Sequence, residues 1–196
     1  MKTAILGGTF NPVHFGHIEL GREVLRHGYE KIIYIPSYIS PHKISSSAGS
    51  LCNASAQDRL EMLRIALEPY DWAEIWDGEI KRGGVSYTID TVRELKKLGI
   101  INRRPALVIG LDLAKDFYQW KNAAELAEEV NILIAGRSSF KEDSFPFSYK
   151  KLNNQLWNYS STEIRQMLRS GKDIRKYVPE GVYTYIMKKG LYDCKK

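Results

Sequence analysis

The sequence predicts a doubly wound α/β fold, in which helices cover both faces of a parallel sheet. Short apolar runs alternate along the chain with segments whose apolar residues recur at helical spacing, as in strands joined by crossover helices. The runs Ile32 to Ile35 and Ala106 to Ile109 contain no charged residue, which is typical of strands buried on both faces. From Ser160 onward the pattern indicates helices alone. This last part is expected to form a small helical C-terminal subdomain.

The predicted elements follow one another in a regular order. Strands are expected at residues 3–6, 31–36, 73–76, 105–110 and 131–135, and helices at residues 18–27, 57–67, 88–98, 122–129, 161–169 and 179–189. Gly99 is expected to end the third helix and Thr88 to be its N-cap. Residues 1–158 would then form a Rossmann-like α/β domain, and residues 159–196 the helical subdomain of the same unit. Such sheets bind ligands at the C-terminal ends of their strands.

Composition excludes several classes of protein. Hydrophobic residues make up 43% of the 196 residues, enough for an ordinary globular core, and no apolar run approaches the twenty residues or so of a membrane helix. Lys2 and Thr3 are followed by only three apolar residues before two glycines, which is far short of a signal-peptide core. Cys52 and Cys194 lie far apart and indicate neither a disulfide framework nor a metal site. A reducing, cytoplasmic setting is expected.

The chain is basic, with a net charge of +6 and an isoelectric point near 9.2. This charge would suit nucleic acid, an acidic surface or a polyphosphate substrate, and most of it is expected to be solvated surface lysine and arginine. A nucleic-acid-binding module would interleave basic and aromatic residues over one surface. The unusual residues here gather at predicted strand ends instead, so we expect neither a nucleic-acid nor a membrane partner.

The segment from Gly7 to His17 follows the first predicted strand and is the most informative in the chain. Its glycines allow the backbone to approach a ligand closely, and the helix that follows offers free N–H groups and a positive dipole end. Two of the four histidines, His14 and His17, lie three residues apart at the helix start, where both rings can meet one phosphate. The glycine spacing fits neither a Rossmann dinucleotide fingerprint nor a Walker A loop. A zinc site is the alternative, but the sequence places no third ligand nearby.

This segment resembles the HxGH motif of the nucleotidyltransferase superfamily. Its sequence is similar in particular to that of the bacterial nicotinate-nucleotide adenylyltransferases and runs Gly-Gly-Thr-Phe-Asn-Pro-Val-His-Phe-Gly-His. The resemblance implies that His14 and His17 bind the ATP phosphates and stabilise the charge that develops at the α-phosphate. The residues from Ser160 to Arg165 resemble the superfamily's SSTxIR motif. A helix start of this kind can hold phosphate, although Ser160 and Glu163 also match a plain capping box. Only phosphate binding accounts for Arg165, and the helix start can bind phosphate and be capped at the same time.

Three middle segments resemble the parts of this family that contact the acceptor and the adenosine. Pro41-His42-Lys43 is similar to its PHK segment, where Lys43 would contact a phosphate, and a solvated loop lysine is the alternative. The residues from Arg82 to Thr88 match its RxGxSYT segment, which implies that Tyr87 and Thr88 meet the nicotinate end. Thr88 as a simple N-cap is the alternative.

The strand ending at Gly110 is followed by Asp112, and the resemblance implies that both contact adenosine and its ribose. It also implies that Trp120 stacks on the pyridine ring, a contact that contributes about 1–3 kcal/mol per base. A core position is the more common role of a tryptophan, but the neighbours of Trp120 are polar. Taken together, the resemblance implies catalytic roles for His14, His17 and Arg165. It implies an ATP-binding set of Gly7, Gly8, Thr9, Phe10, His14, His17, Gly110, Asp112, Ser160, Ser161, Thr162 and Arg165, and an acceptor-binding set of Lys43, Tyr87, Thr88 and Trp120.

The expected activity is transfer of the adenylyl group of ATP to nicotinate mononucleotide by direct in-line attack, with Mg²⁺ held mainly by the ATP phosphates. Nicotinamide mononucleotide is the alternative acceptor, and the segments around Tyr87 and Trp120 argue against phosphopantetheine. A catalytically silent nucleotide sensor is disfavoured because both histidines and Arg165 are present. The serine-rich loop at residues 44–57 is longer than the family's and is either a flap over the substrate or an insertion. The sequence leaves open whether the chain forms a homo-oligomer.

Overall fold

The computed structural model describes residues 1–41, 54–101, 104–136, 145–152 and 159–193. They form a six-stranded, all-parallel sheet in the order β3-β2-β1-β4-β5-β6. The strands are β1 (Thr3–Gly8), β2 (Lys31–Pro36), β3 (Ala73–Ile75), β4 (Ala106–Gly110), β5 (Asn131–Ala135) and β6 (Tyr149–Leu152). The chain moves outward from β1 to β3, then returns to place β4 on the other side of β1. This is the strand order of a doubly wound Rossmann-like sheet, and the predicted fold class is confirmed.

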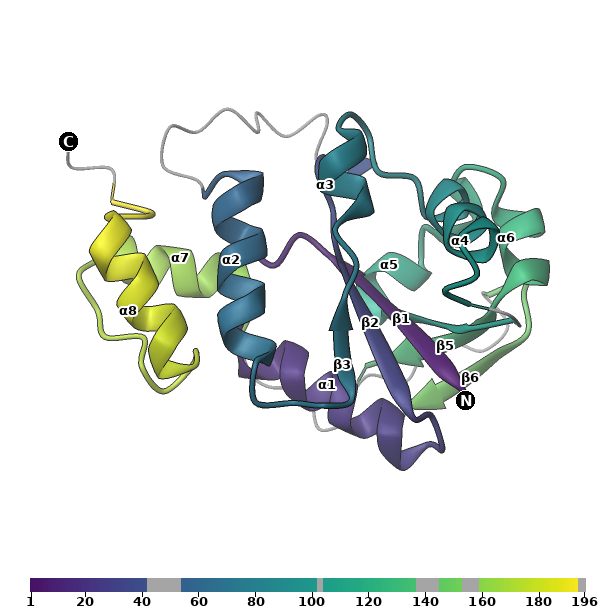
Figure 1. The fold of residues 1–196 in the computed structure, drawn as a ribbon, viewed down its shortest axis with the longest axis horizontal. Helices are drawn as coiled ribbons and strands as arrows, with labels where there is room; N and C mark the ends of the chain where they lie inside the picture. The colour runs from purple at the N-terminus through teal and green to yellow at the C-terminus, as the bar shows by residue number, and fades with distance from the viewer. Residues whose placement is uncertain (42–53, 102–103, 137–144, 153–158, 194–196) are drawn as a thin grey trace.

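Helices lie on both faces of the sheet (Figure 1). One face carries α1 (Phe15–Arg26), α2 (Ala56–Leu67), α7 (Ser161–Arg169) and α8 (Glu180–Lys189), and the other carries α4 (Thr88–Lys97) and α6 (Ala123–Glu129). The shorter elements are α3 (Gly78–Arg82), α5 (Leu111–Ala114) and the 3-10 helix η2 (Phe117–Gln119). No helix in the described part of the chain combines the length and the hydropathy that crossing a membrane requires.

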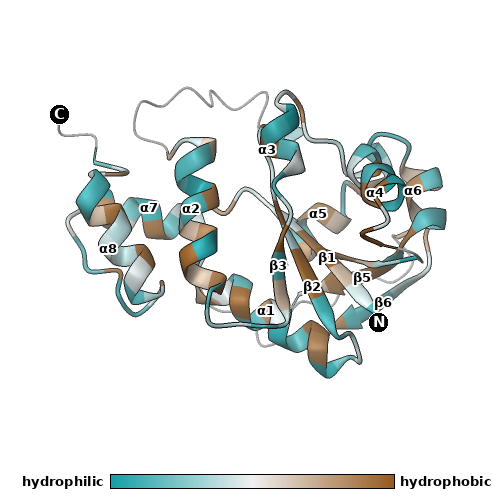
Figure 2. Cartoon of the chain, in the orientation of Figure 1, coloured by the Kyte–Doolittle hydropathy of each residue, from teal (hydrophilic) through white to brown (hydrophobic). Residues whose placement is uncertain are grey.

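Successive strand residues point to opposite faces and so build two separate cores. In β1, Ala4 and Leu6 join the core under α1 and α2, whereas Ile5 joins the core under α4 and α6. Most strands carry many hydrophobic residues, while the helices mix hydrophobic and hydrophilic ones (Figure 2). The helices α7 and α8 contribute Ile164 and Val182 to the first of these cores. The C-terminal helices therefore share a core with the sheet, and the boundary at residue 158 stays a prediction.

The structure corrects the predicted elements at several points. The strand β6 was not predicted because its sequence, Tyr-Lys-Lys-Leu, lacks an apolar run; lysines are common on edge strands, where they discourage pairing with other chains. The helix α1 begins at Phe15 rather than Ile18, so that His17 is already helical. The N-cap of α4 is Tyr87, and Thr88 is its first helical residue, so the prediction of Thr88 as N-cap is wrong. The elements α3, α5 and η2 are too short to show a period.

Candidate active site

The candidate site lies where the loops after β1 and β4 leave the sheet in different directions. In a doubly wound sheet a crevice opens at this point, at the C-terminal ends of the strands. A cavity of about 590 Å³ occupies it. Its lining includes six of the predicted site residues, which are Gly7, Gly8, Thr9, Tyr87, Thr88 and Trp120. The sheet thus brings the end of β1 and the start of α4, about eighty residues apart in sequence, to the walls of one cavity.

Two glycines at this edge have no packing reason to lack a side chain. A Cβ atom on Gly7 or on Gly110 would have no neighbour within 4 Å, and neither residue has a positive φ. By contrast, a Cβ atom on Gly8 would lie 3.0 Å from the ring of Phe10, whose own backbone is left-handed with φ near 50°. Gly8 is therefore explained by the fold. The open space beside Gly7 and Gly110, on neighbouring strands, is what close approach of a ligand requires.

The two histidines form a stacked pair at the start of α1. His14 is the N-cap residue, and its backbone N–H donates to Nδ1 of His17 at 3.2 Å. The ring centroids lie 3.8 Å apart, and the ring of Phe10 meets His17 edge-on at 5.0 Å. Because Nδ1 of His17 accepts a hydrogen bond, the neutral ring carries its hydrogen on Nε2. The backbone thus selects the tautomer that leaves Nε2–H available for a phosphate oxygen.

Burial keeps both rings uncharged in the free protein. It lowers the pKa of His14 from 6.5 to about 4, and burial together with the adjacent His14 holds the pKa of His17 well below its usual range. Among the described residues, Nδ1 of His14 has no hydrogen-bond partner. An approaching polyphosphate would supply both a partner and a negative charge, which favours the protonated ring.

The lowered pKa of His14 predicts a pH dependence of stability. Between pH 6.5 and about 4 the unfolded chain binds a proton at His14 that the folded chain does not, so the free energy of unfolding falls as the pH falls through this window. The contribution is on the order of 3 kcal/mol. Urea unfolding at neutral pH and near pH 5 should therefore show a smaller difference in His14→Asn than in the unchanged protein. Equal differences in the two proteins would contradict this account of the buried ring.

The second predicted phosphate-binding segment lies against the first. Ser160 is the N-cap of α7 and forms the expected capping box with Glu163. The next residue, Ser161, donates its hydroxyl to the carbonyl oxygen of Pro12 at 2.9 Å. Arg165 donates to the carbonyl oxygen of Asn11 at 2.6 Å. The predicted capping box is therefore present, and the start of α7 is hydrogen-bonded to the loop that carries the histidines.

Other C-terminal residues hold this loop as well. The hydroxyl of Tyr192 donates to Oδ1 of Asn11 at 2.6 Å, and the backbone N–H of Phe15 donates to the carbonyl oxygen of Tyr177 at 3.0 Å. The ring of Tyr159 meets His14 edge-on, with ring centroids 5.4 Å apart. This ring contributes to the burial of His14.

Two aromatic side chains, those of Tyr87 and Trp120, line another part of the cavity. Trp120 is partly buried, and its ring centroid lies 4.9 Å from that of Phe117. The ammonium of Lys121 lies 4.8 Å from the centre of the Tyr87 ring and pairs with Asp90 at 2.8 Å. The cavity is thus bounded by an aromatic wall and by the N-terminus of α4, where backbone N–H groups have no partner within the helix.

The remaining predicted residues do not line this cavity or lie outside the described chain. Those that do not line it include the histidine loop and the start of α7, which are Phe10, His14, His17, Ser160, Ser161 and Arg165. Gly110 and Asp112 are exposed at the end of β4 and in the first turn of α5, and Thr162 is exposed on α7. Lys43 and most of the 44–57 loop lie outside the described residues.

Two buried charged residues near the site were not predicted. Glu79 lines the cavity at 6% exposure, and burial raises the pKa of its carboxyl group. Arg59 on α2 is 4% exposed and donates to the carbonyl oxygen of Thr9 at 2.7 Å. In the sequence each belongs to a polar stretch of a helix, and only the three-dimensional structure shows the burial.

Comparison with known proteins identifies the family. Residues 5–167 match the family model described as cytidylyltransferase-like, which covers most of the chain.

The chain belongs to the cytidylyltransferase-like family.

Curated relatives match nearly the whole chain. The chain is 34% identical over 203 residues to a protein of Clostridium tetani described as a probable nicotinate-nucleotide adenylyltransferase, covering 97% of this chain and 98% of the relative. It is 35% identical over 193 residues to a protein of Borreliella burgdorferi with the same description, with coverage of 98% and 97%.

Solved structures agree on the fold. Nicotinic acid mononucleotide adenylyltransferase of Plasmodium falciparum, complexed with NaAD, superposes with a TM-score of 0.77 at 22% identity, and 98% of each chain is covered. The same enzyme complexed with APC gives a TM-score of 0.73 at 21% identity, covering 97% of this chain and 96% of that one. The cytidylyltransferase-like match runs from β1 to α7 and so includes both helix starts of the candidate site.

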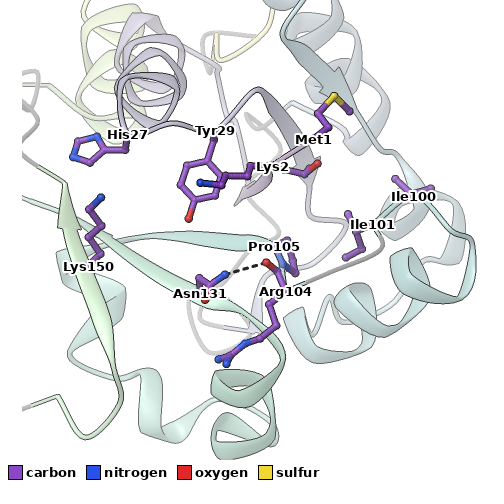
Figure 3. Close-up of a pocket in the computed structure, with 11 residues that line it drawn as sticks. Met1, Lys2, His27, Tyr29, Ile100, Ile101, Arg104, Pro105, Asn131 and Lys150 are labelled. Carbon is purple, nitrogen blue, oxygen red and sulfur yellow. Dashed lines mark hydrogen bonds between the residues drawn. The ribbon is translucent and has the colours of Figure 1, made fainter.

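A larger hollow of about 980 Å³ lies at the opposite, N-terminal edge of the sheet (Figure 3). Lys2, Tyr29, Arg104 and Lys150 are among the residues that line it. None of the predicted site residues does so, and the guanidinium of Arg104 is engaged with the carbonyl oxygens of Ala127 and Val130. The smaller cavity at the C-terminal strand ends therefore remains the candidate site of this cytidylyltransferase-like protein.

Proposed function

We propose that this protein transfers the adenylyl group of ATP to nicotinate mononucleotide, giving nicotinate adenine dinucleotide and pyrophosphate in NAD biosynthesis. The observation that carries the proposal is the contact between the start of α7 and the loop before α1, a loop whose first residues line a cavity with an aromatic wall. Two polyanions and one aromatic ring are what such a site would hold. The printed names of the curated relatives support the same reaction.

The chemistry requires positioning and charge stabilisation rather than a base. An oxygen of the mononucleotide phosphate, already an anion at neutral pH, attacks the α-phosphorus of ATP. The new P–O bond forms as the bond between the α-phosphorus and the bridging oxygen breaks, and pyrophosphate leaves with the electron pair. No covalent enzyme intermediate is needed, since holding the two reactants in line supplies much of the acceleration.

We assign roles to the polar groups of the chain from the resemblance, and their positions support the assignment. His17 would donate Nε2–H to the α-phosphate as negative charge develops there, and His14, Arg165 and the positive dipole end of α1 would bind the remaining phosphate oxygens. Ser160, Ser161 and Thr162 at the start of α7 would contact the pyrophosphate that leaves. Gly7, Gly8, Thr9, Phe10, Gly110 and Asp112 would line the path of the adenosine.

We propose that Mg²⁺ enters with ATP and is held mainly by phosphate oxygens. Among the described residues, no three His, Cys, Asp or Glu side chains converge as metal ligands, so the protein's donors fit an ion held by the substrate. The ion would neutralise charge on the phosphates as pyrophosphate departs. Because ATP is supplied in the cytoplasm, we place the reaction there.

The acid mononucleotide is proposed over the amide because α4 begins at the cavity. The backbone N–H groups and the positive dipole end near Thr88 favour a carboxylate over a neutral amide, and Tyr87, Trp120 and Lys43 complete the proposed acceptor set.

Pyrophosphate release from ATP, measured with each acceptor in turn, tests the proposal. We expect kcat/KM to be at least about tenfold higher with nicotinate mononucleotide than with nicotinamide mononucleotide, corresponding to about 1.4 kcal/mol. Phosphopantetheine should give no release above the background. A preference for the amide would replace the acceptor while leaving adenylyl transfer intact, and no release with any acceptor would refute the reaction itself.

A further inference from the structure

Arg59 has an unusual environment for an arginine. Its side chain is 4% exposed, and among the described residues it forms no ion pair with a carboxylate. Its guanidinium donates instead to two backbone carbonyl oxygens, that of Thr9 at 2.7 Å and that of Tyr38 at 3.1 Å. Burying a charge without a partner of opposite charge is destabilising. The position of Arg59 is therefore better explained by what it joins than by a gain in stability.

The two carbonyl groups belong to different segments, both of which contribute residues to the cavity lining. Thr9 lies in the loop after β1, beside the proposed ATP phosphates, and Tyr38 lies in the segment after β2. The backbone N–H of Tyr38 donates to the hydroxyl of Ser86 at 3.0 Å, and the backbone N–H of Ser86 donates to the carbonyl oxygen of Ile39 at 2.9 Å. Residues 38 and 39 are thus held by α2 from one side and by the turn before α4 from the other.

The connection ends on a second buried charge. The hydroxyl of Ser86 also hydrogen-bonds the carboxylate of Glu79, which accepts a further bond from the hydroxyl of Thr91 at 2.5 Å. Ser86 is 7% exposed and precedes Tyr87 at the acceptor end of the cavity. A continuous hydrogen-bonded path therefore runs from Thr9 through Arg59, Tyr38 and Ser86 to Glu79, and its two ends line the same cavity.

We infer that this path couples the ATP subsite to the acceptor subsite, and that Arg59 is the positioning residue at its centre. The inference rests on the proposed function. When one substrate fixes its own loop, the shared hydrogen bonds fix residues 38 and 86 as well, so the second substrate meets a segment that is already ordered. Each substrate is then expected to tighten the binding of the other by the same factor, about 5- to 100-fold.

The coupling can be measured without turnover. An ATP analogue with a methylene group between the α- and β-phosphorus atoms is titrated calorimetrically, with and without saturating nicotinate mononucleotide. In the unchanged protein we expect the mononucleotide to tighten analogue binding. In Arg59→Met, which keeps the length of the side chain but loses both donors, the two ligands should still bind singly while the tightening disappears.

Two further variants separate coupling from a general loss of structure. Ser86→Ala cuts the path at its other end by removing one hydroxyl, and the tightening should be lost there too, including if Arg59→Met does not fold. Arg64→Met, on the exposed side of the same helix, should keep it. Tightening that persists in Arg59→Met or Ser86→Ala, or is absent from the unchanged protein although both ligands bind, would overturn the inference. Failure of the unchanged protein to bind either ligand would instead refute the proposed function.

Discussion

Replacing His17 with alanine is expected to lower kcat by about 100- to 1,000-fold, the usual effect of removing one donor from a developing oxyanion. The reason is the fixed tautomer: the backbone N–H of His14 occupies Nδ1, so that Nε2–H is the donor left for the α-phosphate. Pyrophosphate release at saturating ATP and mononucleotide measures the effect. Because the ring packs against His14 and Phe10, urea unfolding is measured in parallel to establish that the variant stays folded.

A matched control lies on the same segment of chain. His27 follows the last turn of α1, away from the candidate cavity, and His27→Ala should retain nearly full turnover. A partial recovery is expected in His17→Asn, whose amide supplies an N–H donor in place of the ring. Near-normal turnover of a folded His17→Ala protein would remove this residue from the mechanism.

Replacing Trp120 with alanine is expected to weaken binding of the mononucleotide by about 5- to 100-fold, in line with the 1–3 kcal/mol of a base–aromatic stack. ATP affinity should change little, since the proposed ATP loop at Gly7 to Thr9 forms a different wall of the cavity. Separate titrations with the mononucleotide and with a non-hydrolysable ATP analogue provide the comparison.

The design of this experiment must allow for the packing of Trp120 against Phe117. Trp120→Phe keeps an aromatic face and should retain part of the mononucleotide affinity. Tyr118→Ala removes a neighbouring ring that is 61% exposed and does not line the cavity, so it should leave both affinities unchanged. If Trp120→Ala weakens both ligands equally, the ring acts as part of the core and not as a stacking surface.

Much of the fold could be predicted because most of its strands are recognisable from short stretches of sequence. The central strands β1, β2, β4 and β5 are apolar runs long enough to recognise, and their alternation with helices indicates a parallel sheet. The strand β6 could not be predicted, because an edge strand needs few apolar residues. The helix α3 could not be predicted either, because five residues are too few to show a helical period.

The candidate site also contains residues that the sequence could predict and residues that it could not. The glycine and histidine residues of the β1–α1 loop could be recognised because they lie close together in the sequence. Arg59 and Glu79 could not be recognised, because a charged residue in a helix is expected to be exposed to solvent unless the tertiary packing is known. Neither could the sequence show that Arg165 reaches the carbonyl oxygen of Asn11, a contact between residues 154 positions apart.

That long-range contact has a consequence for the order in which the protein is made. The loop from Asn11 to Phe15 is synthesised early, yet it is held by Ser161, Arg165, Tyr177 and Tyr192, which are synthesised late. A growing chain can therefore assemble most of its sheet on the ribosome while the loop that carries the histidines still lacks its supports. We expect the loop that carries the histidines to reach its final arrangement only after residue 192 has emerged.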